Sequence, residues 1–154
     1  MPPLTEPKGQ ERLLSMIILD TNILSELMRN KPNSSVMAWV NSCQAYELGI
    51  TSITMSEILY GIGKLPEGKR KQNLLSASGK MLEDDFNDRI YPFDEYSAVE
   101  YSVIILIREK MGRPISMADA QIASICFSRG FSLATRNTKD FEGLGVELIN
   151  PWET

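Results

Sequence analysis

The chain has 154 residues, of which 43% are hydrophobic and 23% charged, a balance typical of one globular domain. It contains no histidine, which excludes Ser-His-Asp triads, Cys-His pairs and His-ligated metals and leaves carboxylates, lysine, hydroxyls or a hard cation for any catalysis. The net charge of −4 argues against a uniformly basic nucleic-acid-binding protein, although basic residues gather in three stretches, 64–71, 108–113 and 136–139.

The first 15 residues contain three prolines and show no periodicity, so we expect a disordered leader or extension over residues 1–15, ahead of one domain over residues 16–154. No apolar run approaches the roughly 20 residues that span a bilayer, and we expect a cytoplasmic protein without membrane contact. Both cysteines, Cys43 and Cys126, lie in apolar helical patterns and predict buried, reduced thiols.

Strand and helix patterns alternate along the rest of the chain. Strands are expected over residues 16–19, 47–50, 89–93, 131–135 and 146–149, the first being apolar throughout as in a strand buried on both faces. Helices are expected over residues 21–29, 34–44, 52–65, 69–86, 94–111 and 116–129, the last ended by Gly130. In the helix over 94–111, Val99, Val103, Leu106 and Ile107 fall in register. This alternation predicts an α/β fold, a three-layer α/β/α sandwich with a mainly parallel sheet.

Three separated acidic residues are candidates for a site, because active sites of parallel sheets lie at the carboxyl ends of the strands. Asp20 directly follows the first strand, although Asp also suits the N-cap of the next helix. Glu57 is the only charge in its apolar helix before Lys64, so it requires a partner, a metal or a solvated edge. Asp119 points along an apolar helix face, or completes an approximate capping box with Ser116.

Two further polar residues, Asn137 and Asp140, follow the strand at 131–135, either as ligands or as a polar turn. The denser acidic run at 83–88 has no strand before it and is typical of a solvated helix face. Oxygen ligands without histidine suit Mg²⁺ or Mn²⁺. Convergent carboxylates that hold such cations recur in phosphodiester hydrolysis.

Four blocks of sequence resemble, in order, PIN-domain ribonuclease toxins of the VapC and FitB type, which belong to toxin–antitoxin systems. They are IILDTNILSEL (17–27), SITMSEILYG (52–61), ISMADAQIA (115–123) and LATRNTKDF (133–141). The ending Asn150-Pro151-Trp152 resembles the FitB-like branch in particular. Each block alone is weak, but the four at this spacing are specific, and together they cover nearly the whole chain after its leader.

The resemblance implies a PIN-like fold and an endoribonuclease that depends on Mg²⁺ or Mn²⁺. It assigns metal binding and catalysis to Asp20, Glu57 and Asp119. The family often carries a fourth acid where this chain has Asn137, and Asp140 is the candidate that replaces it as a catalytic acid; one or two metal ions stay open. The candidate substrate-binding residues are Thr21, Asn22, Thr135, Arg136 and Asn137, and the three basic stretches would hold the RNA backbone.

The resemblance also implies partners: a cognate antitoxin that inserts a segment into the acidic groove, a second copy in a homodimer or larger assembly, and DNA only through the antitoxin. Two alternatives stay open. A haloacid-dehalogenase-type phosphatase also has an Asp after its first strand, but needs a second acid where Asn22 stands. A non-catalytic PIN-fold module that binds RNA or protein is compatible with Asn137. The RNA and its cleavage sequence are not specified by the sequence.

Overall fold

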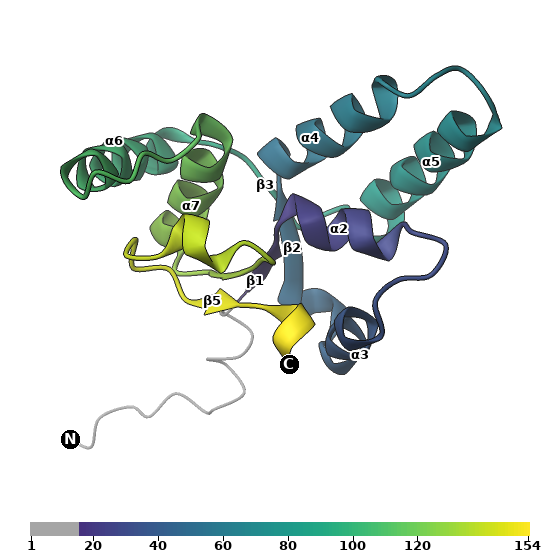
Figure 1. The fold of residues 1–154 in the computed structure, drawn as a ribbon, viewed down its shortest axis with the longest axis horizontal. Helices are drawn as coiled ribbons and strands as arrows, with labels where there is room; N and C mark the ends of the chain where they lie inside the picture. The colour runs from purple at the N-terminus through teal and green to yellow at the C-terminus, as the bar shows by residue number, and fades with distance from the viewer. Residues whose placement is uncertain (1–15) are drawn as a thin grey trace.

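The computed structural model describes residues 16–154, which form a five-stranded parallel sheet between two layers of helices (Figure 1). The strands are β1 (Ile17–Leu19), β2 (Leu48–Thr51), β3 (Ile90–Tyr91), β4 (Ser132–Ala134) and β5 (Leu148–Ile149). They lie in the order β3-β2-β1-β4-β5, and every neighbouring pair is parallel. The predicted α/β/α sandwich is therefore confirmed; the leader expected over residues 1–15 lies outside the described residues.

The helices divide between the two faces of the sheet. One layer holds α2 (Thr21–Leu27), α3 (Ser34–Ser42), α4 (Ser52–Gly63) and α5 (Lys69–Lys80), and the other holds α6 (Glu95–Lys110) and α7 (Met117–Arg129). In Figure 1, α4 and α5 form a hairpin at the right, while α6 and α7 lie at the left. Short helical turns complete the chain: η1 (Ala45–Glu47), η2 (Met81–Asp85), η3 (Thr138–Phe141) and η4 (Pro151–Glu153). None of the helices within 16–154 has the length and apolarity needed to cross a membrane.

Strand β1 is buried on both faces, which explains its uninterrupted apolar sequence. Ile18 packs with Ile104 and Ala123 of the α6–α7 layer, whereas Leu19 packs with Ile23 and Ile58 of the opposite layer. Successive side chains of a strand point to opposite faces, so a central strand needs apolar residues at every position. The residue that follows β1 is therefore held at the middle of the sheet.

Every element boundary except one helix end lies within two residues of the prediction, and the strands at 89–93 and 146–149 are shorter than predicted. The helix expected over 69–86 ends at Lys80 and widens into the π-helical turn η2, in which the Phe86 amide donates to the Met81 carbonyl at 3.2 Å. Leu82 and Phe86 are buried, whereas residues 83–85 face solvent. The acidic run at 83–88 is thus solvated surface, as predicted.

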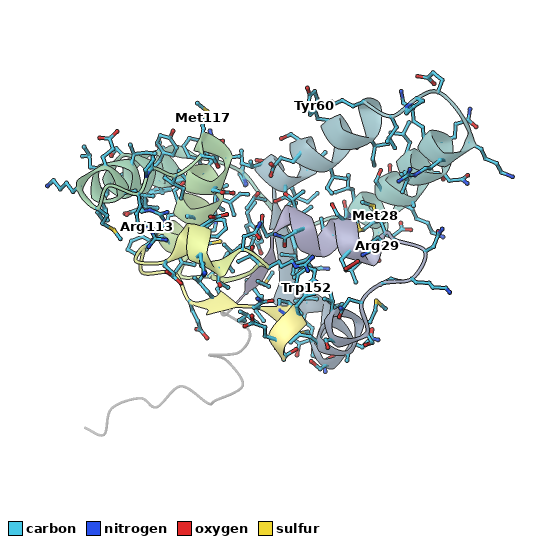
Figure 2. The ribbon with its side chains drawn as sticks, viewed as in Figure 1. Met28, Arg29, Tyr60, Arg113, Met117 and Trp152 are labelled. Atoms are coloured by element: carbon cyan, nitrogen blue, oxygen red, sulfur yellow. The ribbon has the colours of Figure 1, made fainter. Side chains whose placement is uncertain are left out.

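The apolar side of α6 that the sequence pattern predicts faces solvent and not the sheet. Val99, Val103 and Leu106 are 63%, 45% and 57% exposed, whereas Ile104 on the opposite side of the helix packs against α7. Met117, at the beginning of α7, is 66% exposed on the same half of the molecule (Figure 2). Helical periodicity indicates that one side of α6 is apolar, but this side is not the one that covers the sheet.

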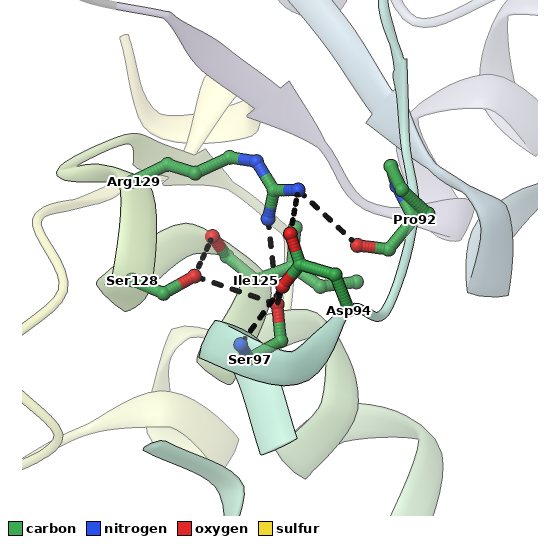
Figure 3. Close-up of polar contacts among 6 residues, drawn as sticks. All are labelled: Pro92, Asp94, Ser97, Ile125, Ser128 and Arg129. Atoms are coloured by element: carbon green, nitrogen blue, oxygen red, sulfur yellow. Dashed lines mark hydrogen bonds and ion pairs between the residues drawn. The ribbon is translucent and has the colours of Figure 1, made fainter. Parts of the chain in front are cut away.

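An ion pair fastens the beginning of α6 to the end of α7 (Figure 3). The Arg129 guanidinium contacts the Asp94 carboxylate at 2.9 Å, and Asp94 also accepts from the Ser97 amide as the N-cap of α6. The Ser97 hydrogen bonds, rather than the ion pair, are the main reason that the pKa of Asp94 is lowered. This network fixes the α6–α7 layer as one unit.

The predictions for Cys126 and for the end of α7 are confirmed, whereas the prediction of a buried thiol is wrong for Cys43. Cys43 and Cys126 are both free thiols; Cys126 is buried, which raises its pKa, while Cys43 is half-buried. Gly130 ends α7 in the left-handed conformation at φ 69°, where a residue with a Cβ would be strained.

Candidate active site

An acidic cleft opens at the carboxyl end of the sheet, where the strand order reverses. β1 is flanked by β2 and β4, and the helices that follow β1 and precede β4 lie on opposite faces of the sheet. Parallel sheets have their natural crevice at such a switch point. The acidic cleft occupies about 680 Å³ and brings together seven of the predicted site residues: Asp20, Thr21, Asn22, Glu57, Asp119, Arg136 and Asn137.

Asp20 is both a helix cap and a member of the acidic cleft. Its Oδ1 accepts from the Thr21 amide at 2.8 Å at the beginning of α2, and its Oδ2 accepts from the Thr135 hydroxyl at 2.7 Å. Burial raises the pKa of Asp20, and although these hydrogen bonds lower it, the charges of Glu57 and Asp140 raise it further. The carboxylate is thus fixed in position, and among residues 16–154 it forms no ion pair.

Asp119 lies in the first turn of α7, where Ser116 accepts from its amide at 3.2 Å as the N-cap. Partial burial, followed by the negative charge of Asp20, raises the pKa of Asp119 to about 6. The two carboxylates therefore repel each other across the cleft. The predicted cap and the predicted site residue are both present in this turn.

Glu57 is exposed at the edge of the cleft, on α4. The Thr21 hydroxyl donates to its Oε1 at 2.8 Å and lies 3.4 Å from the hydroxyl of Thr54. The charge of Glu57 also raises the pKa of both Asp20 and Asp119. Glu57 thus reaches a solvated edge, the alternative considered from the sequence, and this edge belongs to the acidic cleft.

The donor set of the cleft fits a hard divalent cation. Residues 16–154 hold no group of three His, Cys, Asp or Glu side chains already gathered as a metal site. Mg²⁺ does not require one, since it keeps several waters and is commonly held by one or two carboxylates plus a substrate phosphate. Asp20 and Asp119 are two such carboxylates, and the pKa of each is raised by burial first and then by neighbouring negative charge, both of which a bound cation would offset.

The segment after β4 contributes Asn137 but not Asp140 to the wall of the cleft. Asp140 is exposed in η3, and its negative charge raises the pKa of both Asp20 and Asp119. Asp140 therefore influences the site through its negative charge, while the residue of this segment that lines the cleft is Asn137, which carries an amide.

Thr135 is fully buried and does not line the acidic cleft. Its hydroxyl donates to Asp20 at 2.7 Å and accepts from the Asn137 amide at 3.1 Å. Thr135 therefore orients the carboxylate instead of contacting a substrate, which corrects its predicted place among the substrate-binding residues.

Five further residues line the cleft, of which Arg70 belongs to a predicted basic stretch and Trp152 to the ending that resembles the FitB-like branch, while three were not predicted: Ser25, Glu26 and Arg29. Arg29 of the α2–α3 connection and Trp152 of η4 are labelled in Figure 2. Arg29 pairs with the buried carboxylate of Glu26 at 3.1 Å. The sequence did contain a signal for Glu26 and Arg29, because they lie at i+4 and i+7 from Asn22 and so fall on the same side of a helix as Asn22.

The three basic stretches do not all reach the cleft. Arg70 and Arg136 line it, whereas Arg108 is buried at the end of α6. Arg108 donates from Nε to the Arg113 carbonyl and from Nη1 to the Asp140 carbonyl, both at 2.8 Å. The expectation that Arg108 holds RNA is therefore wrong, since its guanidinium instead fixes the backbone of the segment that carries Asp140.

Comparison with known proteins identifies relatives over nearly the whole described chain. The model of the PIN domain family matches residues 17–146. The plasmid stability protein StbB of Pseudomonas syringae is 38% identical over 138 residues, which cover 90% of this chain and 99% of StbB. The VapC ribonuclease Y4jK of Sinorhizobium fredii is 37% identical over 141 residues, covering 90% and 99%. The structure of FitAB bound to an IR36 DNA fragment superposes with a TM-score of 0.84 at 36% identity, over 89% of this chain and 96% of that one.

Proposed function

Because this chain belongs to the PIN domain family, as a member of the VapC and FitB type, we propose that it is a metal-dependent endoribonuclease and the toxin of a toxin–antitoxin pair. The observation that carries the proposal is that Asp20, Glu57 and Asp119, from three separate elements, line one cleft at the carboxyl end of the sheet. The relative that is named a VapC ribonuclease supports RNA as the substrate.

Each polar group of the cleft has a role in phosphodiester hydrolysis. A bound Mg²⁺ or Mn²⁺ would supply an activated water and neutralise charge on the scissile phosphate. Asp20 and Asp119 would hold the cation, and Thr135 keeps Asp20 oriented through its 2.7 Å hydrogen bond. Glu57, held by Thr21, orients the attacking water. Arg70 and Arg136 bind backbone phosphates, which contributes affinity without sequence choice.

The test is RNA cleavage by the purified protein in Mg²⁺, in Mn²⁺ and in EDTA, with single-stranded DNA and a phosphomonoester as parallel substrates. We expect cleavage of RNA alone and only with the cation. Binding of RNA without cleavage would instead support the non-catalytic module, and hydrolysis of the phosphomonoester would support the phosphatase. Sequencing of new 5′ ends in cellular RNA after brief expression, with Asp20→Asn as control, would then identify the RNA that is cut.

A second, larger groove adjoins the acidic cleft and suits the antitoxin. Its apolar lining includes Met28, Ile58, Ile62, Leu65 and Leu74 from three helices and their connections. The groove shares Thr21, Arg29, Glu57 and Arg70 with the cleft, so a segment that fills it would also cover the acids. The similarity to FitAB bound to DNA supports an antitoxin partner through which DNA is contacted.

Gly61→Arg tests this groove. Gly61 lines the groove, is exposed on α4, and a Cβ built on it meets no atom within 4 Å. Arginine should therefore preserve the fold and block the groove, and we expect the variant to lose its co-purifying antitoxin. Gly79→Arg on α5, where a Cβ also meets nothing, is the matched control. Antitoxin capture by Gly61→Arg equal to that of the control would contradict this placement.

The outward face of α6 is the proposed contact with a second copy. Tyr96, Val99, Val103, Leu106 and Ile107 form an uncharged exposed stripe on this helix. A contiguous apolar patch marks a protein contact, and an uncharged one meets its own copy without like-charge repulsion. The α6 stripe lies on the layer opposite the antitoxin groove, so both partners can bind together.

Leu106→Glu should therefore shift the toxin towards the monomer. Placing charge in an apolar interface weakens association because the carboxylate must be desolvated. Light scattering coupled to size-exclusion chromatography measures the mass directly. Tyr60→Glu, at an aromatic residue that is 69% exposed on α4, is the control. If both variants keep the mass of the unmodified protein, the α6 stripe is not the interface.

A further inference from the structure

We propose that Arg136 and Trp152 form a stacking site for an unpaired base of the RNA, next to the phosphodiester that is cut. This inference rests on the proposed function, since it concerns the same substrate. Trp152 and Arg136 line the acidic cleft together with Asp20 and Asp119. The Arg136 guanidinium carbon lies 5.0 Å from the centroid of the Trp152 ring, so a planar cation and a large aromatic surface share one wall.

The backbone holds both members of this stacking pair in place. The Arg136 amide donates to the side-chain oxygen of Asn22 at 3.2 Å, and the Arg136 carbonyl accepts from the Asn150 amide group at 3.4 Å. The side-chain oxygen of Asn150 in turn accepts from the Trp152 amide at 3.0 Å, at the beginning of η4. One asparagine therefore links the backbones of Arg136 and Trp152.

The stacking pair is also connected to the acidic residues. The side-chain oxygen of Asn22 accepts from the Arg136 amide, and the Nδ2 of the same side chain donates to Oδ2 of Asp20 at 3.4 Å. The indole is partly buried against the core around α3, which fixes the ring, and its remaining surface borders the cleft. A base that stacks there would be held at a fixed place relative to Asp20.

A nucleobase is the ligand that this chemistry favours. Unpaired RNA bases are recognised by stacking on aromatic rings or on arginine guanidinium planes, and both surfaces are present here. Arginine also places positive charge beside the indole, which compensates the phosphate attached to the stacked nucleoside. The other half of the cleft supplies carboxylates, which would repel the RNA backbone without a cation. Arg136 and Trp152 therefore attract the RNA on the wall of the cleft that lies away from the carboxylates.

Tryptophan fluorescence tests the stacking site without requiring catalysis. The chain has two tryptophans, so Trp39→Phe leaves Trp152 as the only indole. In this protein with Asp20→Asn added to prevent cleavage, an adenylate trinucleotide in Mg²⁺ should quench the emission. The same trinucleotide with abasic sugars, which has equal charge, should quench little and bind about tenfold more weakly. Equal quenching and equal affinity for the two ligands would overturn the proposal.

Cleavage kinetics give an independent measurement. We expect Trp152→Leu to raise KM for RNA about tenfold while kcat changes little, and Trp152→Phe to retain most of the affinity. Trp39→Leu, the other half-buried tryptophan, is the matched control because it does not line the cleft. An unchanged KM in Trp152→Leu, or loss of antitoxin binding with unchanged RNA affinity, would overturn the stacking site.

The outcomes separate this inference from the proposed function. If Trp152→Leu does not fold, the comparison of base-containing and abasic ligands still decides, because it leaves Trp152 in place. If the base-containing ligand quenches the emission of the Asp20→Asn protein but the protein with Asp20 intact cuts no RNA, the stacking site would be supported and the ribonuclease contradicted. Cleavage with no discrimination between the two ligands would contradict the stacking site alone.

Discussion

Asp20→Asn and Asp119→Asn are each expected to lower the rate of Mg²⁺-dependent RNA cleavage by at least about 100-fold. Both side chains line the acidic cleft, and both have a raised pKa because they are buried close to other negative charges. Asparagine keeps the shape of each side chain but removes the charge that would hold a divalent cation. Single-turnover cleavage of a labelled RNA in Mg²⁺ and in EDTA measures the effect.

The asparagine variants should leave the fold intact, so loss of activity would be specific. Asn caps a helix as well as Asp does, and Asn at position 20 can still accept the 2.8 Å hydrogen bond from the Thr21 amide. Asp84→Asn, on the exposed acidic run, removes one charge outside the cleft and should cleave like the unmodified protein. Unreduced cleavage by either cleft variant, or full cleavage in EDTA, would contradict the proposed roles of the acids.

The second large effect concerns stability and pH. We expect Asp119→Asn to raise the Tm of the metal-free protein at pH 8 by a few degrees, and the gain to fall as the pH is lowered from about 6 to about 4. In the folded chain the pKa of Asp119 is about 6, above its ordinary value of about 3.9 in an unfolded chain. The folded chain therefore binds more protons between these values, and this group destabilises the fold progressively as the pH rises through that window.

Divalent cations should reverse the order of the Tm values of the unmodified protein and Asp119→Asn. At pH 8 the unmodified protein should gain Tm on addition of Mn²⁺, because a cation that binds only the folded state stabilises it. Asp119→Asn should gain much less, since it lacks one of the two carboxylates in the cleft. Thermal melts in EDTA and in Mn²⁺ at pH 4, 6 and 8 measure both effects. A Tm difference that does not change with pH in EDTA would show that burial and the charge of Asp20 do not raise the pKa of Asp119.

The sequence was most informative where local chemistry and topology agree. Asp20 could be placed from its position alone, because the residue after a buried parallel strand must emerge at the carboxyl edge of the sheet. Ser116 and Gly130 marked the ends of α7 for equally local reasons, as N-cap and as left-handed C-terminal residue. For Glu57 the pattern left a solvated edge and a functional role open, and the structure shows that the edge borders the cleft.

The residues that sequence analysis misplaced depend on contacts across the fold. Arg108 belongs to a basic stretch, yet its guanidinium is buried and donates to the carbonyls of Arg113 and Asp140. Asp140 lies far from Arg108 in the sequence, so this contact could not be read from the local pattern. Trp152 drew attention in the sequence only through its resemblance to the FitB-like ending, and it lines the cleft because η4 packs beside α3 with part of the indole ring bordering the cleft. Thr135 follows a strand, as a substrate-binding residue would, and is instead covered completely.

Two properties of this protein were thus fixed by the sequence itself: the alternation that builds a parallel α/β/α sandwich, and the placement of Asp20 after its central strand. Tertiary structure alone decided that Asp119 and Glu57 line the same cleft as Asp20, that the apolar stripe of α6 faces outward, and that the Arg136 guanidinium lies over the Trp152 ring. The physical reason is that periodicity reports which side of an element is apolar or polar. Which element covers that side depends on the packing of segments that are distant in the chain.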